Sequence, residues 1–167
     1  RWRHAVINFP HPLLKQGLVI LDTPGLNAIG AEPELTLSLL PKAHAVLFIL
    51  AADTGVTQSD LAIWKERIGD GGTAKRGRMV VLNKIDGQWD EVKSVAEVDA
   101  DIRRMVSSCA TILGLPERQI FPVSAQKGLV GKVNGDAALL QRSRLPVLEA
   151  ALSGELIQAK REIVYDN

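Results

Sequence analysis

Short apolar runs, each followed at once by a turn or a polar cluster, most constrain the fold of this chain. Four runs have this character: Leu18–Leu21, Ala45–Leu50, Met79–Leu82 and Ile120–Val123. Runs this short, with apolar residues on both faces, are typical of strands buried on both sides of a parallel sheet. Helical patterns lie between them, as crossover helices do between parallel strands. The sequence therefore predicts an α/β fold with a doubly wound, mostly parallel sheet.

The remaining segments predict further helices and one more strand. Apolar residues three and four apart predict a long helix over Val95–Leu113, a short one over Pro33–Leu40 and a last one from Leu145 onward. Arg3–Phe9 is a strand candidate. It should pair antiparallel with the run at Leu18, because the connection between the two is short. That pairing would make the sheet mixed.

Composition bounds the class of protein. The chain has 167 residues, of which 46% are hydrophobic and 23% charged, as in an ordinary globular domain. Its net charge of +1 gives no direct nucleic-acid signal. Cys109 is the only cysteine, which excludes an internal disulfide and favours a cytoplasmic location. The longest apolar run, Ala45–Ala52, is far shorter than the roughly 20 residues of a membrane-spanning helix.

The order of elements predicts a domain boundary near the end of the chain. We expect residues 1–152 to form part of one domain and residues 153–167 to form a helical tail, the start of a helical bundle or stalk. The apolar stripe from Leu145 to Ile163 must pack on something, in this domain or beyond it. The chain begins with Arg1 rather than Met, and we expect it to be a piece of a longer protein.

Polar clusters follow three of the runs, at Asp22–Gly25, Asn83–Asp86 and Ser124–Lys127. The carboxyl ends of parallel strands are where open α/β sheets bind ligands. A carboxylate there, such as Asp22, can hold a magnesium ion through water. The backbone N–H of Gly25 can approach a phosphate closely, because glycine has no Cβ. An ordinary turn after a strand would explain the first cluster equally well by itself.

The Asn-Lys-Ile-Asp cluster carries the most specific signal. The Asp86 carboxylate can accept hydrogen bonds from the N1–H and the 2-amino group of guanine. Adenine lacks both donors and would leave that carboxylate unpaired, which is costly. Asn83 can serve the base edge or tie neighbouring loops together, and the Lys84 stem can cover the base plane. The backbone N–H of Ala125 would face the guanine oxygen.

These clusters, read as D-T-P-G, N-K-I-D and S-A-Q-K, resemble the third, fourth and fifth boxes of the P-loop GTPase superfamily. The stretches Leu18–Asn27 and Glu34–Leu61 are most similar to bacterial dynamin-like GTPases. The resemblance implies a G domain of P-loop NTPase type that binds GTP or GDP and hydrolyses GTP with Mg²⁺. It assigns Ser124 and Lys127 to the base site as well. The second switch loop would contain Thr23, Pro24, Gly25 and Leu26.

The resemblance also implies partners beyond the nucleotide. Dynamin-like proteins typically associate with themselves through the G domain and contact membranes through regions outside it. We therefore expect self-association, membrane contact through parts that lie outside this chain, and a cytoplasmic location that is peripheral at the inner membrane.

The chain departs from the family pattern at two points. Leu26 stands where Ras-like GTPases carry the glutamine that orients water. The P-loop, G-x-x-x-x-G-K-[ST], is absent from the 167 residues, so we expect an N-terminally truncated G domain that is inactive by itself. In such domains the strand feeding the P-loop lies between the runs at Leu18 and Ala45, and without it two apolar edges would stay unpaired. The catalytic residue is unknown.

Two other functions remain open at this point. One is a GTPase of the Era/EngA-like group that assembles ribosomes, which shares the boxes and also lacks the glutamine. The other is a nucleotide-free scaffold that keeps the fold for protein–protein contact. The missing P-loop favours the scaffold, whereas the intact Asn83–Asp86 cluster opposes it.

Overall fold

The computed structural model of the chain describes residues 6–15, 17–22, 43, 45–69, 77–90 and 92–154. The sheet has three strands in the order β1-β2-β3, all parallel. Their bounds are Val46–Ala51 for β1, Arg78–Asn83 for β2 and Ile120–Pro122 for β3. The predicted α/β class and parallel sheet are confirmed, and the strands lie where three of the apolar runs stand in the sequence.

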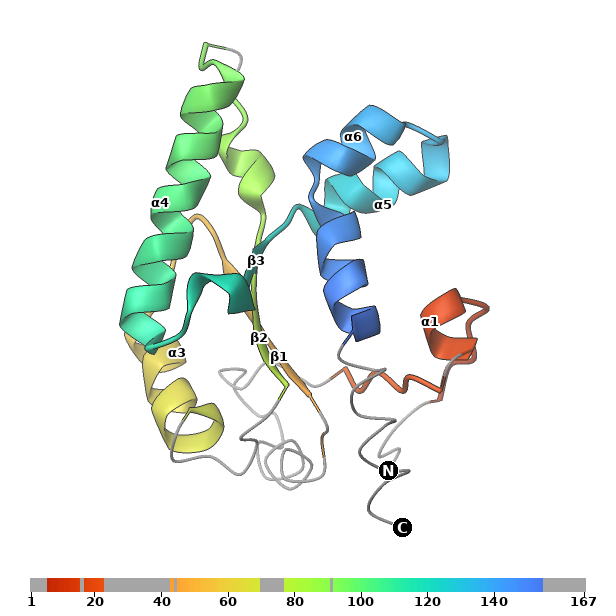
Figure 1. The fold of residues 1–167 in the computed structure, drawn as a ribbon, viewed down its shortest axis with the longest axis horizontal. Coiled ribbons are helices and arrows are strands. Elements are labelled where there is room, and N and C mark those ends of the chain that lie inside the picture. The colour runs from red at the N-terminus through yellow and green to blue at the C-terminus, as the bar shows by residue number, and fades with distance from the viewer. Residues whose placement is uncertain are drawn as a thin grey trace.

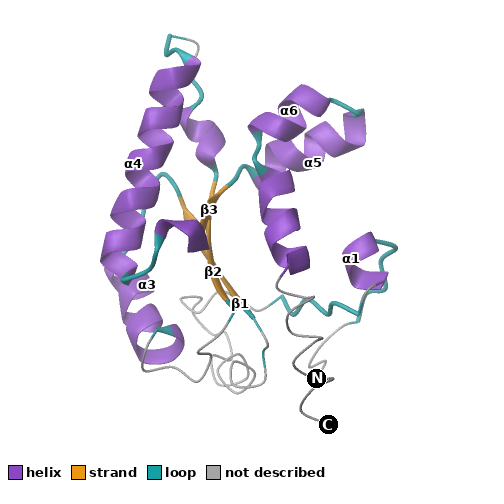
Figure 2. Cartoon of the chain, in the orientation of Figure 1, coloured by secondary structure: helices purple, strands orange, loops and turns teal. Residues whose placement is uncertain are grey.

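Helices cover both sides of this sheet (Figures 1 and 2). The helical elements are α1 Pro12–Lys15, α3 Gln58–Ile63 with a π-helical turn Trp64–Ile68, a 3₁₀ turn Ile85–Gln88, α4 Val95–Leu113, a 3₁₀ turn Glu117–Gln119, α5 Ala125–Asn134, α6 Ala137–Arg142 and a helix over 145–154. In Figure 1, α3 and α4 lie to the left of the sheet, and α5, α6 and the helix over 145–154 lie to its right. None of the described helices is long and apolar enough to cross a membrane.

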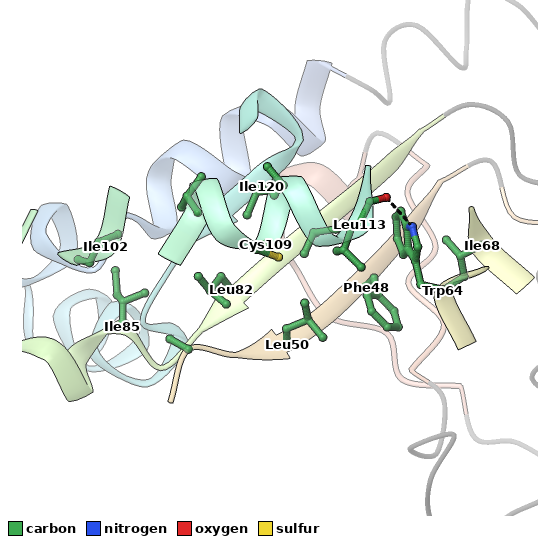
Figure 3. Packing of buried hydrophobic residues seen from close by; sticks show 14 of the residues in the cluster. Phe48, Leu50, Trp64, Ile68, Leu82, Ile85, Ile102, Cys109, Leu113 and Ile120 are labelled. Atoms are coloured by element: carbon green, nitrogen blue, oxygen red, sulfur yellow. Dashed lines mark hydrogen bonds between the residues drawn. The ribbon is translucent and has the colours of Figure 1, made fainter. Parts of the chain in front are cut away.

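Helix α4 has the bounds that the sequence predicts, because both of its ends are capped. Ser94 accepts a hydrogen bond from the backbone N–H of Glu97, and the Glu97 carboxylate accepts one from the backbone N–H of Ser94 in return. Gly114 ends the helix in the left-handed region, at φ 67°. Its apolar stripe closes the main core against β1 and β2 (Figure 3). There the indole N–H of Trp64 donates to the Leu113 carbonyl over 3.0 Å.

The other face of the sheet has a smaller core. Val81, Val123 and Leu148 are buried there, so the helix over 145–154 covers β2 and β3. It does not cover β1, where Leu47 and Ile49 are 37% and 63% exposed. The prediction of burial on both faces is therefore right for β2 and wrong for β1, because a single helix covers only part of this face.

The two predicted N-terminal strands are wrong in their described parts. Residues 6–9 of the Arg3–Phe9 candidate and all of Leu18–Leu21 are irregular, and Val19 is 87% exposed. A strand needs a neighbour to satisfy its backbone groups. Among the described residues, no strand lies beside either segment. The antiparallel pairing is accordingly absent among the described residues, while the helix predicted over Pro33–Leu40 lies outside them.

Candidate functional site

The polar clusters at Asn83–Asp86 and Ser124–Lys127 lie side by side, because β2 and β3 are parallel neighbours and end at the same edge. Asn83 is the last residue of β2. Lys84 then takes the left-handed conformation, with φ 66° and ψ 32°. A residue with a side chain rarely adopts this conformation, and such residues cluster at functional sites. The turn is anchored by Ile85, which is fully buried and donates its backbone N–H to the Val123 carbonyl over 3.3 Å.

The side chain of Asn83 joins the two loops. Its Oδ1 accepts the backbone N–H of Lys84 at 2.8 Å and that of Ala125 at 3.1 Å. Of the two roles open to Asn83, the structure therefore shows the tying of neighbouring loops. The Ala125 N–H, predicted to face guanine, is directed at this oxygen, so a guanine oxygen would have to share or replace that contact. Its role toward the base stays a prediction.

A second bond between the loops orients the carboxylate of Asp86. The Ser124 hydroxyl donates to Asp86 Oδ1 over 2.6 Å. Ser124 is fully buried and is the N-cap of α5, where its Oγ accepts the backbone N–H of Lys127 at 3.3 Å. A hydrogen bond to an ionised oxygen is short and strong. One carboxylate oxygen is thereby held in place, and Asp86 itself stays partly accessible.

This edge of the sheet can bind a flat group that presents two parallel N–H donors. A carboxylate accepts such a pair through its two oxygens. The side chain of Lys84 is exposed beside Asp86, and Lys127 is partly exposed on α5. These are the groups that the sequence assigns to a guanine site, and the described structure brings all of them to one edge.

Of the first predicted cluster, Asp22–Gly25, the structure describes only Asp22. In Figure 1 the orange-red segment 17–22 lies to the right of the lower end of the sheet, the end where β1 and β2 begin. Asp22, at its end, is exposed. Thr23, Pro24, Gly25 and Leu26 lie outside the described residues. The part of the chain that the structure describes contains no group of three or more His, Cys, Asp or Glu side chains able to hold a metal ion. The magnesium role of Asp22 stays a prediction.

Sequence reasoning missed the residues behind the two loops. The backbone N–H of Ser124 donates to the Ser143 carbonyl over 2.9 Å, and Ser143 is fully buried. A Cβ on Gly128 would lie 2.7 Å from Leu145 Cδ2 and 3.0 Å from Ser143 Oγ, so α5 packs closely on this turn. The pair of glycines at Gly128 and Gly131 was the available sequence signal for this close packing.

Comparison with known proteins gives the family context of these clusters. A sequence model described as the dynamin family matches residues 3–85. A bacterial dynamin-like protein of Nostoc punctiforme is 29% identical over 105 residues, which cover 63% of this chain and 14% of that protein. A probable transmembrane GTPase FZO-like, chloroplastic, of Arabidopsis thaliana is 28% identical over 151 residues, covering 86% of this chain and 15% of that protein.

A third relative belongs to another kind of GTPase. GTPase Der of Vibrio campbellii is 28% identical over 142 residues, covering 82% of this chain and 24% of that protein. No solved structure matches the chain at a comparable significance. The chain spans between 14% and 37% of the length of the first curated relatives that it matches.

Proposed function

Because residues 3–85 place the chain in the dynamin family, we propose that it carries the guanine-reading part of a GTPase that binds GTP and GDP. The observation that supports this most is the pair of bonds between the two loops. Ser124 Oγ lies 2.6 Å from Asp86 Oδ1, and the Ala125 N lies 3.1 Å from Asn83 Oδ1. A carboxylate held in this way is preorganised for a base, so binding costs little conformational entropy.

Base selection rests on Asp86. Its carboxylate accepts the N1–H and the 2-amino group of guanine, while Ser124 keeps the group from rotating. Adenine presents neither donor at these positions, so its binding would desolvate a carboxylate without pairing it. The Lys84 stem lies along the base plane with its ammonium in water. Asn83 holds the Ala125 loop against the base edge, and Lys127 flanks the base from α5.

The phosphate side of the site is proposed on sequence alone. Asp22 would hold magnesium through water, and the Gly25 N–H would contact the γ-phosphate within a second switch loop of Thr23, Pro24, Gly25 and Leu26. When bound, magnesium would neutralise charge on the phosphates during hydrolysis. A single exposed carboxylate does not make a metal site, so we derive no step through the ion. The 167 residues contain no P-loop, and by themselves they should hold phosphates weakly and not turn over GTP.

The test is nucleotide competition in the full-length protein and in the 167-residue chain. Fluorescent GTP should bind the full-length protein tightly, with GTP and GDP displacing it and ATP failing to. Asp86→Asn should weaken GTP binding by at least about 100-fold, because the amide cannot accept both guanine donors. The same variant should bind xanthosine triphosphate more tightly than the wild type does. Xanthine carries an oxygen where guanine carries the amino group, and the asparagine amide can donate to that oxygen.

Asp90→Asn is the matched control, because Asp90 is an exposed acid four residues further on whose Oδ1 accepts only the backbone N–H of Val92 among the bonds that the structure describes. It should leave both affinities unchanged. Equal displacement by ATP and GTP, or an Asp86→Asn variant that keeps its guanine preference, would contradict the proposed function. Binding to neither form of the protein would favour the scaffold.

A ribosome-assembly GTPase of the Era/EngA-like group is the second candidate. The match to GTPase Der supports it, because that match covers 82% of this chain. We place it second because the family match is to dynamins. Under the first function we propose GTP-dependent self-association and membrane contact through other parts of the protein. Two pelleting assays of the full-length protein separate the two functions. Pelleting with anionic vesicles would favour the dynamin-like function, and pelleting with ribosomal subunits would favour the ribosome-assembly function.

A further inference from the structure

Three consecutive residues at the end of α6 contact three different elements around the candidate base site. The Arg142 guanidinium lies over the Trp89 ring, 4.2 Å from its centroid. The Ser143 carbonyl accepts the backbone N–H of Ser124. The Arg144 guanidinium donates to Asp99 Oδ1 on α4 over 2.6 Å. We call these residues, 142–144, the corner, because the chain turns here from α6 into the helix over 145–154.

Two of these contacts lead directly to the loops that hold the base in the proposed function. Trp89 donates its backbone N–H to the Asp86 carbonyl over 3.0 Å, so it closes the 3₁₀ turn that carries Asp86. Ser124 is itself the partner of the Asp86 carboxylate. The corner therefore contacts the Asp86 turn on one side and the Ser124 loop on the other.

The corner is a defined structure and not a loose connection. Ser143 is fully buried, and its hydroxyl donates to the Leu140 carbonyl and accepts the backbone N–H of Leu145. Arg144 is left-handed, with φ 59°, a conformation that costs a non-glycine residue free energy. The surrounding contacts must supply that energy. Its ion pair with Asp99 is partly buried and supplies one of them.

Apolar packing between the corner and α4 is incomplete, because an open pocket of about 360 Å³ lies between them. Its walls include Trp89, Asp99, Arg142 and Arg144. The Trp89 turn and α4 both pack in the main core, and the corner is joined to them by two polar contacts, each of which one substitution removes.

We propose that the corner is a positioning element that fixes the Asp86 turn against the Ser124 loop and so sets the selectivity for guanine. This rests on the proposed function. Arg142 and Arg144 touch no nucleotide and act through Trp89, Asp99 and Ser124. With the corner released, the Asp86 carboxylate is less well aimed at the 2-amino group. GDP should then dissociate faster, and the preference for guanine over hypoxanthine, which lacks that amino group, should fall.

The test uses the full-length protein and labelled GDP, with dissociation rates measured against excess GDP and equilibrium competition by GDP, IDP and ADP. Arg142→Ala and Asp99→Ala should each speed dissociation by about threefold or more, and the ratio of GDP to IDP affinity should fall by a similar factor. Lys132→Ala is the matched control. It removes an ion pair to Glu149 between α5 and the last helix, in the same helical unit but away from the base loops.

The outcomes separate the inference from the proposed function. If the wild type does not prefer GDP to ADP, the proposed function fails. If it does, and the GDP to IDP ratio of both variants equals that of Lys132→Ala, the corner is only structural and the inference is wrong. Where Arg142→Ala lowers the melting temperature too far to assay, Arg142→Lys keeps a cation on the Trp89 ring and should restore most of the ratio. A ratio as low in Arg142→Lys as in Asp99→Ala would contradict the role of Arg142.

Discussion

Ser124→Ala should be among the most damaging single-atom deletions in the described part of the chain. The hydroxyl is fully buried and makes two bonds. It donates to Asp86 Oδ1 over 2.6 Å and accepts the backbone N–H of Lys127 at 3.3 Å as the N-cap of α5. Alanine can replace neither bond, and the side chain is too enclosed for water to take over easily.

The magnitude follows from the two bonds. Loss of an N-cap costs about 1 kcal/mol, and loss of a hydrogen bond to a charged group costs about 1.5–3 kcal/mol. The bond to Lys127 is long, at 3.3 Å, so the loss of the N-cap should cost less than the usual free energy. We expect the free energy of unfolding to fall by about 2–4 kcal/mol. A further part of the effect should appear as faster GDP dissociation, because the Asp86 carboxylate can then rotate.

Urea unfolding followed by tryptophan fluorescence measures the first effect. Ser108→Ala is the control, because Ser108 is exposed on α4, and a serine to alanine change there should stay within about 0.5 kcal/mol of the wild type. If Ser124→Ala unfolds at the same urea concentration as Ser108→Ala, the bond between Ser124 and Asp86 does not contribute in solution and the reasoning is refuted.

Two further predictions concern packing and pH. Gly131→Ala should lower the free energy of unfolding by about 1–3 kcal/mol, because its Cβ would lie 2.8 Å from the backbone N of Leu140. Gly154→Ala, helical and in open space, should raise it by up to about 1 kcal/mol, and urea unfolding that ranks the two alike would contradict the packing of α5 on α6. Burial raises the pKa of the Cys109 thiol from 9.0 to about 11, so the unfolded chain releases this proton at lower pH than the folded one does. Stability from this thiol is complete below pH 9.0 and declines as the pH rises toward about 11, and unfolding curves at pH 8 and 10 should show a smaller loss in Cys109→Ala.

The sequence predicts an element correctly where residues close to it in the chain set both of its ends. Helix α4 begins after Ser94 and ends at Gly114, as the spacing of apolar residues and the glycine predict, because both caps are made by neighbours in the chain. The polar clusters after β2 and β3 could likewise be placed together. Parallel strands end at the same edge of a sheet, so sequence order alone brings Asp86 close to Ser124.

Leu18–Leu21 shows where this reasoning stops. Four apolar residues in a row indicate a strand, yet the structure leaves Val19 and Ile20 87% and 68% exposed. A strand forms only beside another strand, and the sequence of the segment itself does not specify which strand that is. The half-exposed β1 has the same cause, since the helix over 145–154 covers β2 and β3 and leaves Leu47 and Ile49 open.

By itself, then, the sequence determined the α/β class, the family resemblance and the residues that we propose to read a base. Only the tertiary structure decided which apolar runs pair, that Asn83 ties two loops, and that the corner joins them to α4. Arg144 and Asp99 are 45 residues apart in the chain and 2.6 Å apart in space. No periodicity or short motif encodes a contact of that separation, because it depends on how α4 and the turn after α6 come to rest on the same sheet.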